Sequence, residues 1–170
     1  GDYTEHGIFG LDFNGDLYVL DWWRAQAASN VWIEKQCDLI GRYSPLIWFG
    51  ESGPIRKAIE PFLKRRMTER QTACRLEWLP SIGDKVVRAR AFQARASMGN
   101  VWLPTDSPWL PDLMSQLMRF PAGKYDDAVD VCSLVGRGLE FARPPQVPKQ
   151  PKADSIPAPA PRNDGLGWMS

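Results

Sequence analysis

Apolar and polar positions in the first part of the chain predict a β-hairpin followed by a helix. Residues 6–13 (HGIFGLDF) and 17–22 (LYVLDW) are strand-like runs, and the N-G-D letters at residues 14–16 are a strong hairpin signal. Residues 29–43 then carry apolar side chains at helical spacing behind a Ser or Asn cap. We therefore expect two hairpin strands and then a helix.

The chain continues to residue 141 as strand–helix alternation. The short apolar run at residues 45–50 (PLIWFG) is typical of a buried central strand. Pro54 suits the first turn of a helix expected over residues 55–71, and Pro61 is a candidate break inside it. The remaining predicted elements are strands at residues 74–79 and 101–103 and helices at residues 85–98, 107–118 and 126–141. This alternation predicts an α/β fold.

The composition changes near residue 143, which sets the predicted domain boundary. The residues before it are enough for one domain with a substantial core. From Arg143 to the end, the chain contains seven prolines among small and polar residues, a composition that does not support a packed core. We expect residues 1–142 to form the domain. Residues 143–170 are predicted to be a Pro-rich tail or linker that lies extended, with Trp168 as its anchor.

Membrane spans and zinc sites are not expected from this sequence. No apolar run approaches about 18 residues, and the first residues do not resemble a signal peptide. The three cysteines, Cys37, Cys74 and Cys132, lack C-x-x-C spacing, and His6 is the single histidine. The cysteines are therefore predicted to be reduced, buried thiols of a cytoplasmic protein.

A formal net charge of +1 conceals an asymmetry along the chain. Residues 56–95 contain eleven Lys and Arg against four Asp and Glu, a net +7, while all other residues together sum to −6. A basic middle beside a separate acidic cluster suits a polyanion that one part holds and another part attacks. The alternative for any single charge run is an ordinary solvated helix face.

The acidic cluster lies in the stretch FPAGKYDDAVD at residues 120–130. Asp126 and Asp130 are spaced i,i+4, and Asp127 and Asp130 are spaced i,i+3. In a helix, like charges at these spacings cost roughly 0.2–0.5 kcal/mol per pair. Two interpretations explain why the chain tolerates this repulsion. The acids suit a helix N-terminus, where backbone N–H groups are unpaired, or a divalent cation neutralises them.

A further acid, Glu51, directly follows the apolar run at residues 45–50 and precedes Gly-Pro and a helix. The carboxyl end of a central strand is where α/β sheets place their chemistry, and a loop-exposed acid is the alternative. Together with the aspartates, Glu51 would complete an oxygen-ligand site that suits Mg²⁺ or Mn²⁺. Two such ions about 3.5–4 Å apart hydrolyse phosphodiesters by activating a water and stabilising the leaving oxygen.

Four stretches carry a resemblance to a known family. They are, in order, GDYTEHGIFGLDFNGDLYVLDWWRAQ, LIWFGESG, GDKVVRARAFQARASMGNVWLP and FPAGKYDDAVD. Over about residues 1–140, the chain resembles the C-terminal nuclease domain of phage terminase large subunits. The resemblance implies an RNase H-like mixed sheet flanked by helices, related to RuvC-type resolvases. It also implies an endonuclease that cuts concatemeric viral DNA with Mg²⁺ or Mn²⁺ in the cytoplasm of an infected bacterium. A portal protein and a small terminase subunit are the implied partners.

Residue by residue, the resemblance assigns the second catalytic acid to Glu51 and the third to Asp127. Asp126 and Asp130 become auxiliary ligands, Asp126 with a share in catalysis, and Asp2 matches an accessory acid. The family's first catalytic aspartate lies on a first central strand upstream of the GDYT stretch. We therefore expect that strand to be missing from these residues and the metal centre to be incomplete without it. The sequence contains no G-x-x-x-x-G-K-[ST], so the packaging ATPase is not expected here.

The basic stretch then acquires a predicted role in holding double-stranded DNA. Phosphate contacts of Lys and Arg are independent of base sequence and strongly salt-dependent. The candidates are Lys85, Arg88 and Arg90 in the K-x-x-R-A segment and Lys57, Lys64 and Arg65 before it. For Arg88, a structural hydrogen bond to a strand-end carbonyl is the alternative. Two other functions stay open: a RuvC-like resolvase or repair nuclease, and a DNA-binding or motor-docking module that does not cleave.

Overall fold

The computed structural model describes residues 3–140, so the predictions for Asp2, for the tail and for Trp168 lie outside the described residues. Strands and helices alternate along this part of the chain. Their order is β1 (Thr4–Leu11), β2 (Leu17–Ala25), α1 (Ser29–Tyr43), β3 (Ile47–Ser52), α2 (Pro54–Glu69), β4 (Arg75–Pro80), α3 (Lys85–Ser97), β5 (Val101–Trp102), α4 (Leu110–Arg119) and α5 (Asp127–Gly138). The predicted elements are all present, with ends displaced by at most three residues.

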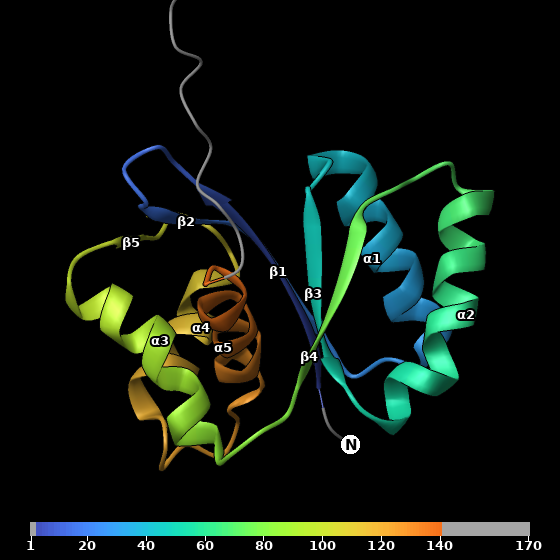
Figure 1. Ribbon diagram of the computed structural model, residues 1–170. Helices are drawn as coiled ribbons and strands as arrows, with labels where there is room; N and C mark the ends of the chain where they lie inside the picture. The colour runs from blue at the N-terminus through green and yellow to red at the C-terminus, as the bar shows by residue number, and fades with distance from the viewer. Residues whose placement is uncertain (1–2, 141–170) are drawn as a thin grey trace, which may run out of the picture.

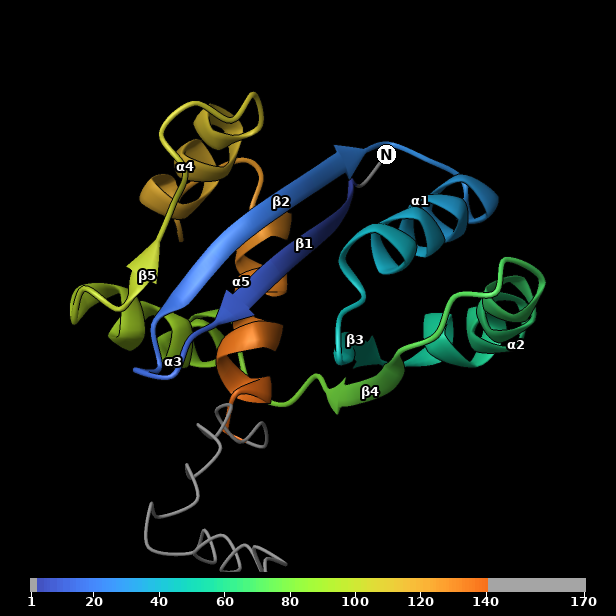
Figure 2. The same cartoon turned by 90° about the horizontal axis from the view of Figure 1, so that it is seen from above.

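The elements form two halves, which lie on the left and right of Figure 1 and are seen from above in Figure 2. The hairpin half, residues 3–25 and 84–140, contains a sheet in the order β1-β2-β5 with helices α3, α4 and α5. The α1–α2 half, residues 29–80, contains the parallel pair β3-β4 with helices α1 and α2. The second half is one continuous segment, so the chain leaves the hairpin half once and returns to it once.

The β1–β2 hairpin forms where the pattern predicts it, because its turn residues supply both the backbone conformation and the polar contacts. Gly15 has a φ of 86°, which glycine adopts without steric cost. The Asp12 carboxylate accepts hydrogen bonds from the backbone N–H groups of Asn14 at 2.9 Å and Asp16 at 2.8 Å. The two strands pair antiparallel over their length, with one irregularity after Ile8.

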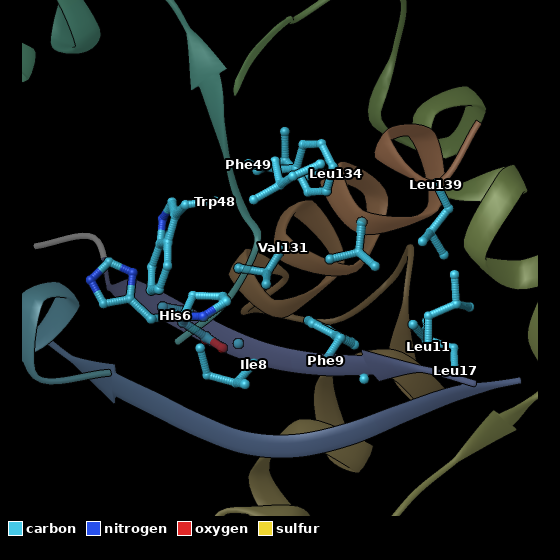
Figure 3. A pocket seen from close by; sticks show the side chains of 16 residues that line it. His6, Ile8, Phe9, Leu11, Leu17, Trp48, Phe49, Val131, Leu134 and Leu139 are labelled. Carbon is cyan, nitrogen blue, oxygen red and sulfur yellow. The ribbon is translucent and has the colours of Figure 1, made fainter. Parts of the chain in front are cut away.

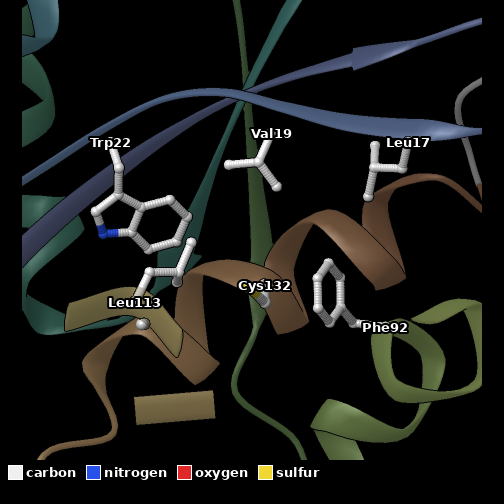
Figure 4. Close-up of a cluster of buried hydrophobic side chains, with 7 residues drawn as sticks. Leu17, Val19, Trp22, Phe92, Leu113 and Cys132 are labelled. Carbon is white, nitrogen blue, oxygen red and sulfur yellow. The ribbon is translucent and has the colours of Figure 1, made fainter. Parts of the chain in front are cut away.

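The core of the hairpin half lies between its sheet and its three helices. Leu17, Val19 and Trp22 of β2 are buried on the same face of the sheet. The helices contribute Phe92 from α3, Leu113 from α4 and Cys132 from α5, as Figure 4 shows, and Ala128 of α5 belongs to the same core. Helix α5 approaches α3 closely because Gly136 has no side chain: a Cβ there would lie 2.7 Å from the backbone nitrogen of Phe92. Packing of α5 against α3 therefore depends on this glycine.

A second core joins α1 and α2 to the β3-β4 pair. Its buried members are Ile33, Cys37, Ile40, Leu63 and Met67, with Trp32, Trp48 and Trp78 packed against them. These tryptophans thus belong to a core.

The predicted burial of β3 is corrected by the structure. β3 is half-buried along most of its length, exposes Glu51, and pairs only with β4 within the described part of the chain. Its apolar side chains serve two neighbours. Trp48 packs on the second core, whereas Phe49 lies against Gly138 of α5. An apolar run can therefore mark a strand between two packed layers as well as a fully buried one.

The predicted break in α2 is wrong, because α2 runs continuously with Pro61 inside it. A proline removes the hydrogen bond to the carbonyl four residues earlier, here that of Lys57. Both residues are exposed, so water can solvate the freed carbonyl and the helix continues.

The architecture is mixed α/β, as predicted. Cys37 and Cys132 are buried free thiols, and Cys74 is a partly buried one. Among residues 3–140, no helix is both long and apolar enough to cross a membrane.

Candidate functional site

Asp126, Asp127 and Asp130, hereafter the acid turn, lie where α5 begins. Asp126 is the residue before the helix, and the other two lie in its first turn. The Asp126 side chain makes no capping hydrogen bond to the helix, but negative charge at this end is favourable through the helix dipole. The predicted acidic helix start is therefore confirmed. Whether the acids also suit a metal depends on what surrounds their oxygens.

Two cations from α3 contact the acid turn. Lys85 Nζ lies 2.7 Å from Asp126 Oδ1 and 2.8 Å from Asp130 Oδ2. Arg88 Nη2 lies 3.2 Å from Asp130 Oδ1, and Arg88 Nη1 donates to the Gly83 carbonyl at 2.9 Å. The sequence predicts that both cations hold DNA phosphates, but in the structure they pair with predicted metal ligands. For Arg88, the structural alternative is a hydrogen bond to a strand-end carbonyl; the bond is present, but its acceptor Gly83 lies in the loop between β4 and α3.

Asp127 differs from its two neighbours. Within residues 3–140, its carboxylate has no hydrogen bond or ion pair. Partial burial raises the pKa of Asp127; Lys85 opposes this shift, and the charges of Asp126 and Asp130 add to it. A partly desolvated carboxylate without a direct partner gains the most from a cation. Asp127 is therefore the carboxylate of the acid turn with which no cation pairs directly within residues 3–140.

A buried network centred on Glu5 of β1 supports the acid turn. The Glu5 carboxylate accepts hydrogen bonds from Trp22 Nε1 at 2.6 Å, Gln116 Nε2 at 2.7 Å and Arg24 Nε at 2.9 Å. Gln116 Oε1 accepts in turn from the backbone N–H of Ala128 at 3.0 Å, one of the donors that a helix leaves unpaired in its first turn. The network thus links β1 through α4 to the start of α5.

Sequence reasoning missed this network, because Glu5 and Gln116 are 111 positions apart and no local signal marks either residue. Burial raises the pKa of Glu5, and hydrogen bonds from Gln116 and Trp22 oppose that shift. Arg24 also stacks on Tyr3, with its guanidinium carbon 3.4 Å from the ring centre. One cation therefore joins the buried carboxylate to aromatic side chains near the acid turn.

Glu51 lies at the exposed end of β3 and is not among the charged groups that shift the pKa of Asp127. In residues 3–140, no group of three or more His, Cys, Asp or Glu side chains is arranged to hold a metal ion. A cation shared by Glu51 and Asp127 thus stays a prediction, and Asp2 falls outside the described residues.

The remaining predicted DNA-binding residues divide into paired and unpaired ones. Lys64 pairs with Glu60 at 2.7 Å, and Arg65 pairs with Glu69 at 2.9 Å, each along α2. The others are Lys57 on α2 and Arg90 on α3, which are exposed and make no ion pair within the described part of the chain. Their charge is therefore available to an external anion.

An apolar groove of about 160 Å³ lies between β1 and β3, with α5 along it. Labelled lining residues in Figure 3 include Ile8, Phe9, Leu11, Trp48, Phe49, Val131, Leu134 and Leu139. Among residues 3–140, β1 pairs only with β2, and β3 pairs only with β4. Each strand therefore has one edge without a strand partner beside the same apolar groove, which is what an additional strand requires.

Comparison with known proteins assigns no family. No protein-family model matches the sequence, and no curated protein matches it. The chemistry of the acid turn and of its supporting network is therefore the basis for a function.

Proposed function

We propose that this chain is a metal-dependent DNA endonuclease domain of the terminase type. The observation that supports this most is Asp127, a half-buried carboxylate with no direct partner in residues 3–140, at a helix start held by the Glu5–Gln116 network. Leaving a carboxylate partly desolvated and unpaired costs free energy. A purely structural ion-pair cluster has no reason to leave one carboxylate unpaired, whereas a metal site needs a carboxylate whose oxygens are free to bind the ion.

In this proposal, Glu51, Asp127, Asp126 and Asp130 would hold Mg²⁺ or Mn²⁺, and their hard carboxylate oxygens suit these ions. When bound, the ions would supply an activated water and stabilise the leaving oxygen of a phosphodiester. Arg24 and Lys85 favour the ionised form of Asp127 through their charge. Double-stranded DNA as substrate, and a portal protein and small terminase subunit as partners, belong to the same proposal by resemblance.

The proposal includes an RNase H-like sheet in which one more strand lies in the groove between β1 and β3. Its support is the apolar lining and the two strand edges without partners among the described residues. Fusion of an alternating Val/Thr strand through a flexible linker tests this: amides of β1 and β3 should gain protection from hydrogen exchange. Unchanged protection in both strands would argue against a vacant strand position.

Mn²⁺ binding, followed by the electron paramagnetic resonance signal of the free ion, tests the metal site directly. Asp127→Asn should weaken binding by about tenfold or more, while the unfolding midpoint is kept. In a protein that also carries the first catalytic aspartate, it should abolish Mn²⁺-dependent nicking of supercoiled plasmid. Asp112→Asn is the matched control, because Asp112 is an exposed acid in the first turn of α4. Undiminished Mn²⁺ binding by Asp127→Asn contradicts the proposal, and so does a wild-type protein that binds no Mn²⁺.

A DNA-binding module that does not cleave is the second candidate. It is favoured by the lack, among residues 3–140, of a group of three side chains arranged to hold a metal. Such a module would bind DNA without nicking it, and Mn²⁺ would not change its affinity. In either case, replacing Lys57 and Arg90 by Ala should reduce the slope of log Kd against log salt by roughly two units, one for each lost phosphate contact. The paired Lys64 and Arg65 should contribute less to that slope.

A further inference from the structure

Lys85 occupies a distinctive position at the acid turn. It is the first residue of α3, and its ammonium lies between two carboxylates of the acid turn, at 2.7 Å from Asp126 and 2.8 Å from Asp130. Its side chain is 28% exposed, so the ammonium is partly shielded from water and still within reach of a ligand. Lys85 is thus a cation held by oxygens that the proposed function assigns to a metal.

We propose that Lys85 is an internal counter-cation that must leave Asp126 and Asp130 before a divalent cation can use them. The inference rests on the proposed function and adds its regulation. An ammonium and a divalent cation both within about 3 Å of the same carboxylate oxygens would repel one another strongly in a partly buried site. The two therefore exclude each other, whereas Asp127, which Lys85 does not bridge, is open to the ion in both states.

Release of Lys85 gives the chain a second cation for DNA. Arg90 lies on the same helix, is exposed, and has no ion pair in residues 3–140. A freed Lys85 would add to this positive charge and contact a phosphate, the role that the sequence predicts for it. Because coupling between two ligands is reciprocal, metal would then raise the affinity for DNA, and DNA would raise the affinity for metal by the same factor.

Lys85→Met tests the inference, because methionine keeps an unbranched stem and removes the charge. The variant should bind Mn²⁺ about 5–10-fold more tightly than the wild type, a factor within the usual range of such couplings. It should also lose the Mn²⁺-dependent gain in DNA affinity. Lys57→Met is the matched control, since Lys57 is exposed on α2 and pairs with no acid in the described part of the chain. It should leave the Mn²⁺ affinity unchanged and should lower the DNA affinity to the same extent with and without Mn²⁺.

A second measurement uses the wild-type protein and does not depend on how a variant folds. The Lys85 ammonium, held by two carboxylates, should give a slowly exchanging signal in ¹⁵N-detected NMR of lysine side chains, and Mg²⁺ should abolish it. Persistence of that signal at saturating Mg²⁺ overturns the inference, as does Mn²⁺ affinity in Lys85→Met that equals or falls below the wild-type value. These results leave the proposed function intact. Absence of metal binding in both proteins overturns the proposed function and the inference together.

Discussion

The two halves of the molecule use charged residues in opposite ways. In the α1–α2 half, ion pairs run along the exposed face of α2: Arg65 pairs with Glu69 at 2.9 Å, and their side chains are 79% and 42% exposed. In the hairpin half, Glu5 has a fully buried side chain and pairs with Arg24 across two strands. The same residue types thus serve the surface in one half and the interior in the other.

The difference teaches where charge determines position. Exposed pairs can rearrange at little cost and contribute little to stability, whereas a buried carboxylate with three donors has one favourable arrangement. The charges of the hairpin half therefore determine where the acid turn lies. The charges of the α1–α2 half pair along the surface of a basic helix. Three of the four proposed metal ligands, Asp126, Asp127 and Asp130, belong to the half in which charges determine position, whereas Glu51 belongs to the other half.

The largest loss of stability is expected when Glu5 is replaced. In Glu5→Leu, the donors of Trp22, Arg24 and Gln116 lose a shared acceptor in a buried site. Removing one partner of a buried pair costs about 3–5 kcal/mol, which urea unfolding would measure. Glu5→Gln keeps one acceptor oxygen and should cost less. A loss below about 1 kcal/mol in Glu5→Leu would show that the network does not position α5.

His6 lies where the halves meet and should make their junction sensitive to acid. It stacks on Trp23 of β2 and meets Trp48 of β3 edge-on, and burial lowers the pKa of His6 from 6.5 to about 4. Below pH 6.5 the His6 side chain is protonated in the unfolded chain, but in the folded chain it stays neutral until about pH 4. Stability is therefore complete above pH 6.5 and falls as pH drops toward 4, by at most about 3 kcal/mol.

His6→Phe removes this titration and keeps an aromatic ring. The unfolding free energy of the wild type minus that of the variant should be constant above pH 6.5 and should decrease below it. Other acids, Glu5 included, titrate in both proteins and cancel in this difference. A difference that stays constant down to pH 4 would assign the acid sensitivity to other groups.

A pair of glycines tests packing in each half. In Gly136→Ala, the new Cβ would meet the backbone of Phe92 at 2.7 Å, and overpacking of this kind costs about 1–3 kcal/mol. Gly53 precedes α2, and a Cβ there has no neighbour within 4 Å among the described residues. Gly53→Ala creates no clash and should cost only about 0.5–1 kcal/mol, because alanine is less favourable than glycine before a helix. Equal losses in the two variants would mean that α5 can shift away from α3.

The smallest effect is expected on the exposed face of α2. Glu69→Gln removes the partner of Arg65 and Arg66, and exposed pairs within one helix contribute only about 0.3–0.5 kcal/mol each. Chemical unfolding should detect almost no change, and that small change should vanish at high salt. A loss comparable with that of Glu5→Leu would remove the distinction between the halves.

Local patterns predicted much of the fold because the relevant interactions are local. The hairpin turn depends on Asp12 and Gly15, which act within a few residues, and the helix at residues 29–43 follows from its own spacing. Pro61 was misjudged because its effect depends on exposure, which a single helix pattern does not reveal. The buried central strand was misjudged because β3 divides its apolar side chains between two layers.

The site was harder to predict because its partners come from distant parts of the chain. Spacing alone identified the acid turn, but not that Arg88, 42 positions before Asp130, would pair with it. The sequence likewise shows where the lysines are, but not which of them remain available to DNA. Lys57 has no ion pair within residues 3–140, whereas Lys85 has two. Tertiary packing determines which charged residues pair, and local sequence patterns carry no information about such pairing.

The strand edges beside the groove between β1 and β3 bear on the aggregation of the purified protein. A strand edge without a partner can form main-chain hydrogen bonds with any extended polypeptide, including a second copy of itself. At high concentration the protein is therefore expected to aggregate edge to edge, with kinetics that steepen with concentration. The additional strand of the proposed function would cover these edges and would oppose such aggregation.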